Sequence, residues 1–379
     1  MIKCAIVVPC YKSELTQNEL VSLVQCDKVL NEYDRFFVMP KGITIPHGFE
    51  DWKTKYFDEA FFSSVSTYNR LMLSAAFYDE FLDYDYILVY QLDAFVFENR
   101  LMSFCEMKYD YIGAPWPVGF CYHTKEKSKV LYVGNGGLSL RNTGAIKKWI
   151  TNNIDYIQTC FDEYGWNEDV VISFSDDMNI APVDVAKSFS IENGYATTYE
   201  IITKNMPFGS HGLLRYDFKL AQRIYALYGY EVEPVDNPFA KVDLKLLQKE
   251  NIIFENSFFD NYIAEIFGMA FPDFNKEVII WGAGNIGEKI CWIMKRNGIK
   301  IECVLDSSSR KEEIDGIKIV NPIEYLRLNK SKNVIVAFKH NDEAIAYLND
   351  IPNSQEIRYR TYSEIYEYAY QLYLQRRKQ

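Results

Sequence analysis

Residues 86–97, YILVYQLDAFVF, form a run that is apolar enough for a buried strand, yet they carry a carboxylate at Asp93. Such a short continuous apolar run is typical of a central strand in a parallel sheet, and we predict a strand here. Because an unpaired buried carboxylate is costly, Asp93 requires a cation, a set of hydrogen-bond donors or an exposed strand end. A helix cap or a turn just past the strand is the other interpretation, and this stretch alone leaves it open.

Strands and helices alternate outward from this run. CAIVVPCYKS (residues 4–13) and RFFVMPKG (35–42) have the composition of buried strands that end at Pro and Gly. Helical spacing of apolar residues predicts single helices over residues 15–30, 62–84 and 142–160. Alternation of this kind predicts a doubly wound α/β sheet, whose ligands lie beyond the carboxyl ends of the strands. Asp93 lies near such an end.

A second α/β pattern begins after Phe274, where VIIWGAGNIGEKI places Gly282, Gly284 and Gly287 between a strand and a helix. Asp306 ends the next strand, near the spacing expected for an acid that binds a ribose. We predict a Rossmann-like accessory domain with a nucleotide site, although the pattern indicates the fold more strongly than the ligand. The predicted domains are therefore residues 1–217, a helical extension at 218–274, and residues 275–379.

Composition excludes several classes of function. The net charge of −11 disfavours broad nucleic-acid binding, because the protein would repel the phosphate backbone. The eight cysteines form no Cys-x-x-Cys pair, which argues against a zinc ribbon or a redox motif. No segment reaches the length of about 18–20 apolar residues that a membrane span needs. We expect a cytoplasmic protein, with association at the inner face of the membrane left open.

Four motifs of the first domain occur in a recognisable order: YQLDAF around Asp93, then VGNGGLSLRN, WNEDVVIS and PFGSHG. This set resembles the core of nucleotide-sugar glycosyltransferases of the GT-A fold, over roughly residues 1–215. More narrowly, YNRLMLS, YILVYQLDAFVF, DYIGAPW, VGNGGLSLRN and PFGSHG resemble the bacterial family catalogued as domain of unknown function 5672. Proteins of that family are often associated with the synthesis of surface polysaccharides.

The resemblance implies a fold and a set of roles. It implies a GT-A-like mixed sheet in the first domain, with Asp93 and His211 as ligands of Mn²⁺ or Mg²⁺. It implies that an acid, Asp169 or its neighbour Glu168, accepts the proton of the acceptor hydroxyl. The loop that borders the donor sugar comprises Gly134, Asn135, Gly136 and Gly137. An imidazole ligand favours Mn²⁺ over Mg²⁺.

The sequence departs from the family pattern at Gln91, which stands where the first acid of the Asp-x-Asp element would be. Gln91 adds no charge, so metal affinity is expected to be lower, or catalysis to proceed without metal. A glutamine here can still bind the ribose or a metal-bound water. The other residues that the resemblance implies for the donor nucleotide are Pro9, Tyr11, Lys12, Asn69 and Arg70. For Lys12 and Arg70, a solvated surface charge is an equally good interpretation.

Local explanations exist for the remaining motif residues. Asn-Gly is a hairpin signal, so Gly134–Gly137 can be a tight turn that also brings bare backbone beside a sugar. Glu168 and Asp169 also fit the start of a helix, which favours negative charge.

We therefore expect a glycosyltransferase of the hexosyltransferase type, metal-dependent and inverting, acting in surface-polysaccharide synthesis. Its donor would be a UDP-sugar and its acceptor a glycan or lipid-linked glycan. The rival interpretations are an NAD(P)-dependent oxidoreductase or a sugar-nucleotide-modifying enzyme centred on the C-terminal domain, and an inactive sugar-binding scaffold.

Overall fold

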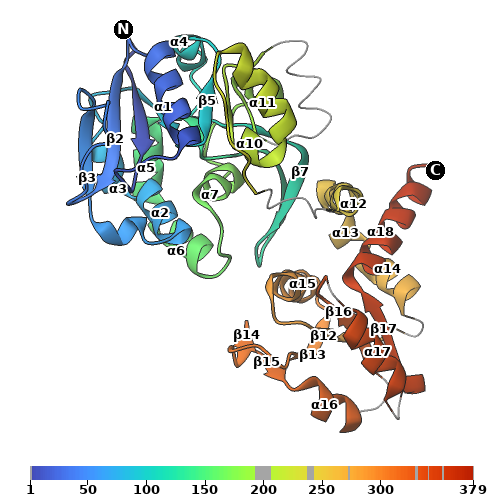
Figure 1. The fold of residues 1–379 in the computed structure, drawn as a ribbon. Coiled ribbons are helices and arrows are strands. Elements are labelled where there is room, and N and C mark those ends of the chain that lie inside the picture. The colour runs from blue at the N-terminus through green and yellow to red at the C-terminus, as the bar shows by residue number, and fades with distance from the viewer. Residues whose placement is uncertain are drawn as a thin grey trace. The chain divides into compact units, whose positions relative to one another are not determined.

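The structure, a computed structural model, describes residues 2–192, 206–236, 243–271, 274–328, 332–339, 341–351 and 354–378. It divides into two compact units (Figure 1). The first contains Met1–Gly119 and Leu131–Val242, and the second contains Phe120–Val130 and Asp243–Gln379. The described parts of the predicted extension are shared between them, residues 218–236 with the first unit and 243–271 with the second.

The first unit is built on a six-stranded mixed sheet. Its order is β3 (Lys53–Phe57), β2 (Asp34–Pro40), β1 (Cys4–Pro9), β4 (Tyr86–Tyr90), β9 (Leu138–Asn142) and β6 (Tyr111–Ile112). The first four strands are parallel, whereas β9 is antiparallel to both of its neighbours. A smaller sheet has the order β10 (Ser190–Ile191), β11 (Gly209–His211) and β5 (Ala94–Val96).

Helices surround these sheets. They are α1 (Gln17–Val29), η1 (Glu59–Phe62), α2 (Val65–Met72), α3 (Ala75–Asp79), α4 (Leu101–Cys105), α5 (Thr143–Asn152), α6 (Ile154–Asp162), α7 (Glu168–Phe174), α8 (Val183–Phe189), α10 (Leu213–Tyr216) and α11 (Phe218–Leu227). Helix α1 begins at a capping box, in which Thr16 and Glu19 satisfy each other's backbone N–H groups. Its Leu23 and Cys26 are buried in one core with Ile6 and Leu88 of the sheet.

Three predicted elements are interrupted in the structure. The predicted strand over residues 86–97 is two strands, β4 and β5, that belong to different sheets. The predicted helix over 62–84 ends at Met72 and restarts as α3, because the Ser74 hydroxyl caps a new helix by accepting from Phe77 N–H. The predicted helix over 142–160 is likewise divided at Asn153.

The second unit has its own six-stranded sheet. Its order is β14 (Glu313–Ile314), β15 (Ile317–Val320), β13 (Lys300–Leu305), β12 (Glu277–Trp281), β16 (Lys332–Val336) and β17 (Ile357–Thr361). All of its neighbours pair in parallel except β14 and β15. The five parallel strands, numbered along the chain, have the order 3-2-1-4-5 of a Rossmann fold.

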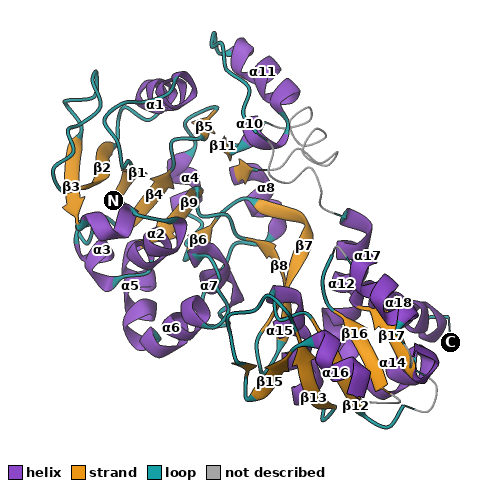
Figure 2. Cartoon of the chain, turned by 60° about the horizontal axis from the view of Figure 1, so that its bottom comes forward, coloured by secondary structure: helices purple, strands orange, loops and turns teal. Residues whose placement is uncertain are grey.

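Both faces of this second sheet are covered, as Figure 2 shows for its flanking helices. The helices are α12 (Leu244–Phe254), η2 (Glu255–Ser257), α13 (Phe258–Asn261), α14 (Ile263–Ala270), α15 (Asn285–Arg296), α16 (Pro322–Leu328), α17 (Asp342–Asp350), η3 (Ser354–Glu356) and α18 (Tyr362–Arg376). Successive residues of β12 point to opposite faces: Ile280 packs in the core of α14, α15 and α18, and Ile279 in the core of α16 and α17.

The predicted fold class is confirmed, since an α/β unit with a mixed sheet is followed by a second α/β unit. Within the described ranges, no helix combines the length and the apolar character needed to cross a membrane.

A hairpin from the middle of the sequence enters the second unit. Strands β7 (Pro115–His123) and β8 (Ser128–Val133) pair with each other, and their tip, Phe120–Val130, belongs to the second unit. His123 is fully buried, with its ring against Phe254 at 4.6 Å between centroids and its Nδ1 2.6 Å from Ser128 Oγ. Arg296 of α15 donates to Ser128 Oγ at 2.6 Å and forms an ion pair with Asp260 at 2.9 Å.

Replacing Arg296 with alanine should destabilise the second unit. The change removes the ion pair and leaves the Asp260 carboxylate partly buried without its cation, which should lower the free energy of unfolding by about 3 kcal/mol. Urea unfolding followed by tryptophan fluorescence measures the loss. Lys300→Ala is the matched control, because Lys300 is exposed and its ion pair with Glu277 should contribute little to stability. Equal losses in the two variants would contradict a structural role for Arg296.

Candidate active site

Asp93 lies in a turn at the carboxyl end of β4. The chain leaves β4 at Tyr90, and Gln91 N–H donates to Gly137 O at 2.8 Å before β5 begins at Ala94. Strand β11 pairs with β5 so that His211 stands opposite Ala94. The division of the predicted strand therefore explains why an apolar run contains a carboxylate. Asp93 occupies the turn between two sheets, and His211 contacts it from the neighbouring strand.

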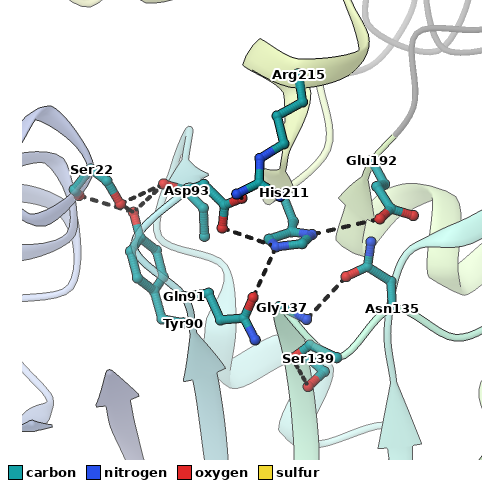
Figure 3. Close-up of polar contacts among 12 residues, drawn as sticks. Ser22, Tyr90, Gln91, Asp93, Asn135, Gly137, Ser139, Glu192, His211 and Arg215 are labelled. Atoms are coloured by element: carbon teal, nitrogen blue, oxygen red, sulfur yellow. Dashed lines mark hydrogen bonds and ion pairs between the residues drawn. The ribbon is translucent and has the colours of Figure 1, made fainter. Parts of the chain in front are cut away.

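Asp93 and His211 form the charged centre of the site (Figure 3). His211 Nε2 lies 3.0 Å from Asp93 Oδ1, and Arg215 Nη2 lies 3.4 Å from Asp93 Oδ2. Burial alone would raise the pKa of Asp93, but His211 and Arg215 outweigh it and hold that pKa below its ordinary value. Burial disfavours the charged imidazole, yet Asp93 and Glu192 outweigh it and raise the pKa of His211 to about 10.

Gln91 adds a third donor atom to this centre. Its Oε1 lies 3.2 Å from His211 Nε2, and its Nε2 donates to the Tyr68 hydroxyl at 3.2 Å. Neighbouring ligands of an octahedral ion lie about 3 Å apart when each is about 2.1 Å from the metal. The Asp93 and Gln91 oxygens both lie at hydrogen-bond distance from His211 Nε2, so the three groups are close enough to bind one ion.

The protein's contribution to a metal site would be small. Among the described residues, no three His, Cys, Asp or Glu side chains have the spacing of metal ligands. An ion here would therefore rest on Asp93, His211 and the uncharged Gln91, with water or substrate oxygens completing its coordination. Because His211 has a raised pKa, metal binding would also have to displace its proton.

The loop that precedes β9 (Gly134–Gly137) approaches this centre through the backbone of its glycines. Asn135 has a φ of +63°, and its Oδ1 accepts a hydrogen bond from Gly137 N–H at 3.0 Å. A Cβ on Gly137 would lie 2.0 Å from His211 Nε2, and one on Gly136 would lie 1.9 Å from Glu168 Oε1. Gly134 is equally constrained, since its Cβ would meet the Trp116 ring at 2.0 Å. Glycine is required here because the neighbouring groups occupy the space of a side chain.

The two acids at the start of α7 have different surroundings. Glu168 is buried and pairs with the fully buried Arg141 at 2.9 Å. Asp169 Oδ2 instead accepts a hydrogen bond from Gly136 N–H at 3.2 Å. Burial, with the charges of Glu168 and Glu192, raises the pKa of Asp169 to about 7. Asp169 therefore has the position and the pKa that suit a general base, while the charge of Glu168 is neutralised by Arg141.

The residues predicted to bind the nucleotide are spread over several elements. Pro9 ends β1, and beyond it Tyr11 is exposed while Lys12 pairs with Glu19 at 2.8 Å. Asn69 is buried and donates to Asn167 Oδ1 at 2.9 Å, just before Glu168. Arg70 pairs with Asp162 on α6 and lies over the Phe161 ring. Asn69 thus supports the start of α7, whereas the charges of Lys12 and Arg70 have partners on the protein.

Sequence reasoning missed Arg215, described above, and two further residues of this centre. Glu192 follows β10, and its Oε1 lies 3.8 Å from His211 Nδ1. Arg141, in LSLRN, is the buried cation that compensates Glu168. The sequence features that could have indicated them are an acid at a strand end and an arginine inside an apolar strand. Neither feature predicts a site residue unless its neighbours in the folded structure are known.

In the predicted nucleotide loop of the second unit, the structure constrains two of the three glycines. Gly282 has a φ of +122°, and a Cβ on Gly287 would lie 1.8 Å from Gly282 O. A Cβ on Gly284 would meet no atom within 4 Å. Asp306 accepts hydrogen bonds from Ala283 N–H at 2.8 Å and from two further backbone N–H groups, which lower its pKa against the effect of burial. Asp306 therefore holds the loop itself.

Replacing Gly137 with alanine should disturb the site and the fold together. The new Cβ overlaps the His211 ring and should lower the free energy of unfolding by about 1–3 kcal/mol. Gly144→Ala in α5 is the control, because its nearest neighbour would be 3.9 Å away and alanine favours a helix. Denaturant unfolding should separate the two, and a fully stable Gly137→Ala protein would refute the close approach of loop and imidazole.

Comparison with known proteins gives matches for both units. Residues 274–356 match the family described as C2185-like, N-terminal. No curated protein matches the chain. The galactosyltransferase LgtC, with donor and acceptor sugar analogues, aligns at a TM-score of 0.40 and 15% identity, over 62% of this chain and 98% of LgtC. Mouse xyloside xylosyltransferase 1 aligns at 0.39 and 12%, over 56% of this chain and 98% of that protein. Residues 51–211 match the family described as protein of unknown function (DUF5672), which confirms the family resemblance that the motifs of this segment predicted.

Proposed function

We propose that the first unit is a glycosyltransferase that moves a sugar from a nucleotide-sugar donor to a glycan acceptor. One observation carries the proposal: the glycine loop joins the cluster of Asp93, His211 and Gln91 to an acid of raised pKa. Gly137 lies against His211, and Gly136 N–H donates to Asp169. A sugar above this bare backbone would have a charge-stabilising centre on one side and a base on the other.

Asp93, His211 and Gln91 are the proposed ligands of Mn²⁺ or Mg²⁺. A bound ion would stabilise the negative charge that grows on the leaving diphosphate. Arg215, 3.4 Å from Asp93 and about half exposed, supplies a further positive charge at the same edge. Pro9, Tyr11, Lys12, Asn69 and Arg70 remain the proposed surroundings of the donor nucleotide, for which we favour a UDP-sugar.

Asp169 is the proposed general base. With a pKa near 7 it can accept the proton of an acceptor hydroxyl near neutral pH. A base on the acceptor side suits single displacement at the anomeric carbon, with inversion of configuration. Glu168 is less suited, because its carboxylate is committed to Arg141.

The Asn135 side chain supports a ligand in this position. Asn135 is 3% exposed, and its Nδ2 donates to no group within the described residues. A buried donor without an acceptor costs about 1–3 kcal/mol. Gly137 N–H fixes the orientation of the amide through Oδ1, and we propose that the unpaired Nδ2 donates to an oxygen of the donor sugar.

The wider role follows the family resemblance. We propose a hexosyltransferase that acts in the cytoplasm, at or near the inner face of the membrane, on a glycan or lipid-linked glycan of a bacterial surface polysaccharide. The second unit is proposed as an accessory nucleotide-binding domain, because its loop is open at Gly284, where an added Cβ would meet no atom within 4 Å. That open loop is also the observation that favours the alternative, an NAD(P)-dependent oxidoreductase or sugar-nucleotide-modifying enzyme.

A thermal-shift screen separates these functions. UDP- and GDP-sugars, NAD⁺ and NADP⁺ are each added with and without Mn²⁺, and the melting temperature is recorded. The glycosyltransferase should be stabilised by a nucleotide sugar when Mn²⁺ is present. Stabilisation by NAD⁺ or NADP⁺ alone, with no response to any nucleotide sugar, would favour the oxidoreductase.

Asp169→Asn should reduce turnover and leave donor binding intact. Asparagine keeps the shape of the side chain but accepts no proton, so kcat should fall by about 10²–10⁴-fold. In the unmodified enzyme, kcat/KM should rise as the pH passes about 7 and then level off, because the base works only when deprotonated. This rise should disappear in the variant, as a pH series of initial rates would measure.

Glu168→Gln is the matched control at the neighbouring position. It leaves the buried Arg141 without its counter-charge, so the free energy of unfolding should fall by about 3 kcal/mol. If Glu168→Gln abolishes turnover in a folded protein while Asp169→Asn does not, the base is Glu168.

A further inference from the structure

The two nitrogens of His211 face different partners. Nε2 lies 3.0 Å from Asp93 Oδ1 and 3.2 Å from Gln91 Oε1, on the side of the proposed metal ligands. Nδ1 is buried and has no hydrogen-bond partner within the described residues. The carboxylate that faces it is Glu192, at 3.8 Å (Figure 3). A ring nitrogen can bind a metal only through its lone pair, so the proton must then reside on Nδ1.

Glu192 is held in place from the opposite side. The Tyr216 hydroxyl donates to Glu192 Oε1 at 3.2 Å, and the Glu192 side chain is only 14% exposed. Tyr216 ends α10, the short helix that starts after Gly212. Gly212 has a φ of +62°, and a Cβ there would lie 3.1 Å from the Tyr216 ring, so the glycine gives the ring its room.

These contacts suggest a role for Glu192 that differs from the roles of the metal ligands. A carboxylate on the Nδ1 edge of an imidazole lies away from an ion bound at Nε2, and it therefore acts through the histidine. Histidine ligands commonly donate their other N–H to a carboxylate, which fixes the tautomer and the orientation of the ring. The buried Nδ1 needs such an acceptor, and Glu192 is the charged group that faces it.

We propose that Glu192, supported by Tyr216, is a positioning residue that keeps the Nδ1 proton of His211 in place and presents Nε2 to a divalent cation. This inference rests on the metal site of the proposed function, and it assigns a role to two residues outside the proposed ligand set.

Direct Mn²⁺ titration, followed by the electron paramagnetic resonance signal of free Mn²⁺, tests the proposal without an activity assay. Glu192→Ala should weaken Mn²⁺ binding by about 10–100-fold. Glu192→Gln should lose less, because an amide oxygen still accepts a hydrogen bond. Tyr216→Phe should weaken binding least, since Glu192 keeps its charge. Glu106→Ala, which removes an exposed carboxylate after α4, should bind as the unmodified protein does.

A second measurement separates positioning from a general loss of structure. The chain has four histidines, so the ¹⁵N spectrum of its imidazoles is simple, and His211→Gln identifies the His211 signals. With Zn²⁺ as a diamagnetic probe, the proton should reside on Nδ1 in the unmodified protein. In Glu192→Ala that tautomer should no longer dominate, while the melting temperature stays close to that of the unmodified protein.

The outcomes are distinguishable from those of the proposed function. Equal Mn²⁺ affinity in Glu192→Ala and the unmodified protein overturns the role of Glu192. An unmodified protein that binds a nucleotide sugar but no Mn²⁺ overturns both this role and the metal site, and leaves a metal-free transferase. Weaker Mn²⁺ binding in Glu192→Ala supports the role of Glu192 even if no sugar transfer is found.

Discussion

The candidate site depends on one steric constraint, the absence of side chains at Gly136 and Gly137. His211 occupies the space that a Cβ on Gly137 would fill, and Glu168 occupies the space beside Gly136. The same two residues provide backbone groups, since Gly136 N–H donates to Asp169 and Gly137 O accepts from Gln91 N–H. The loop therefore lets strands β4, β9 and β11 and helix α7 converge on a small volume.

This convergence places several carboxylates close together, and their negative charges are not equally neutralised by neighbouring cations. Arg141, fully buried, pairs with Glu168 and donates to Gly136 O and to the Tyr78 hydroxyl. Asp93 has His211 and Arg215 as cationic partners. Asp169 forms no ion pair with a cation among the described residues, and burial, with the charges of Glu168 and Glu192, raises its pKa. The distribution of cations thus distinguishes the acid suited to proton transfer from the others.

The fold was largely predictable because its signals are local. The buried strand at residues 4–9 indicates an α/β fold in the first unit, and the glycine pattern at 282–287 indicates one in the second. The breaks were harder to predict: one serine, Ser74, restarts a helix, and the turn at Asp93 separates strands of two sheets within one apolar run. Within the site, Asp93, Asn135, Asp169 and His211 come together from distant motifs. Glu192 and Arg141 were not predicted as site residues, because their roles depend on the groups that they contact. Those contacts form only when the chain has its tertiary structure.

The hairpin at residues 120–130 has a consequence for how the chain is made. Its Thr124 carbonyl and Ser128 hydroxyl bind Arg296, and the first of these contacts spans 172 residues. At ordinary translation rates of about 5–20 residues per second, the tip would wait roughly ten to thirty seconds for that partner. During that time the apolar side of Cys121 and the ring of His123, both buried in the finished protein, have no core to enter. During synthesis, the nascent chain therefore carries the whole sequence of the first unit while the tip of this hairpin still lacks its partner.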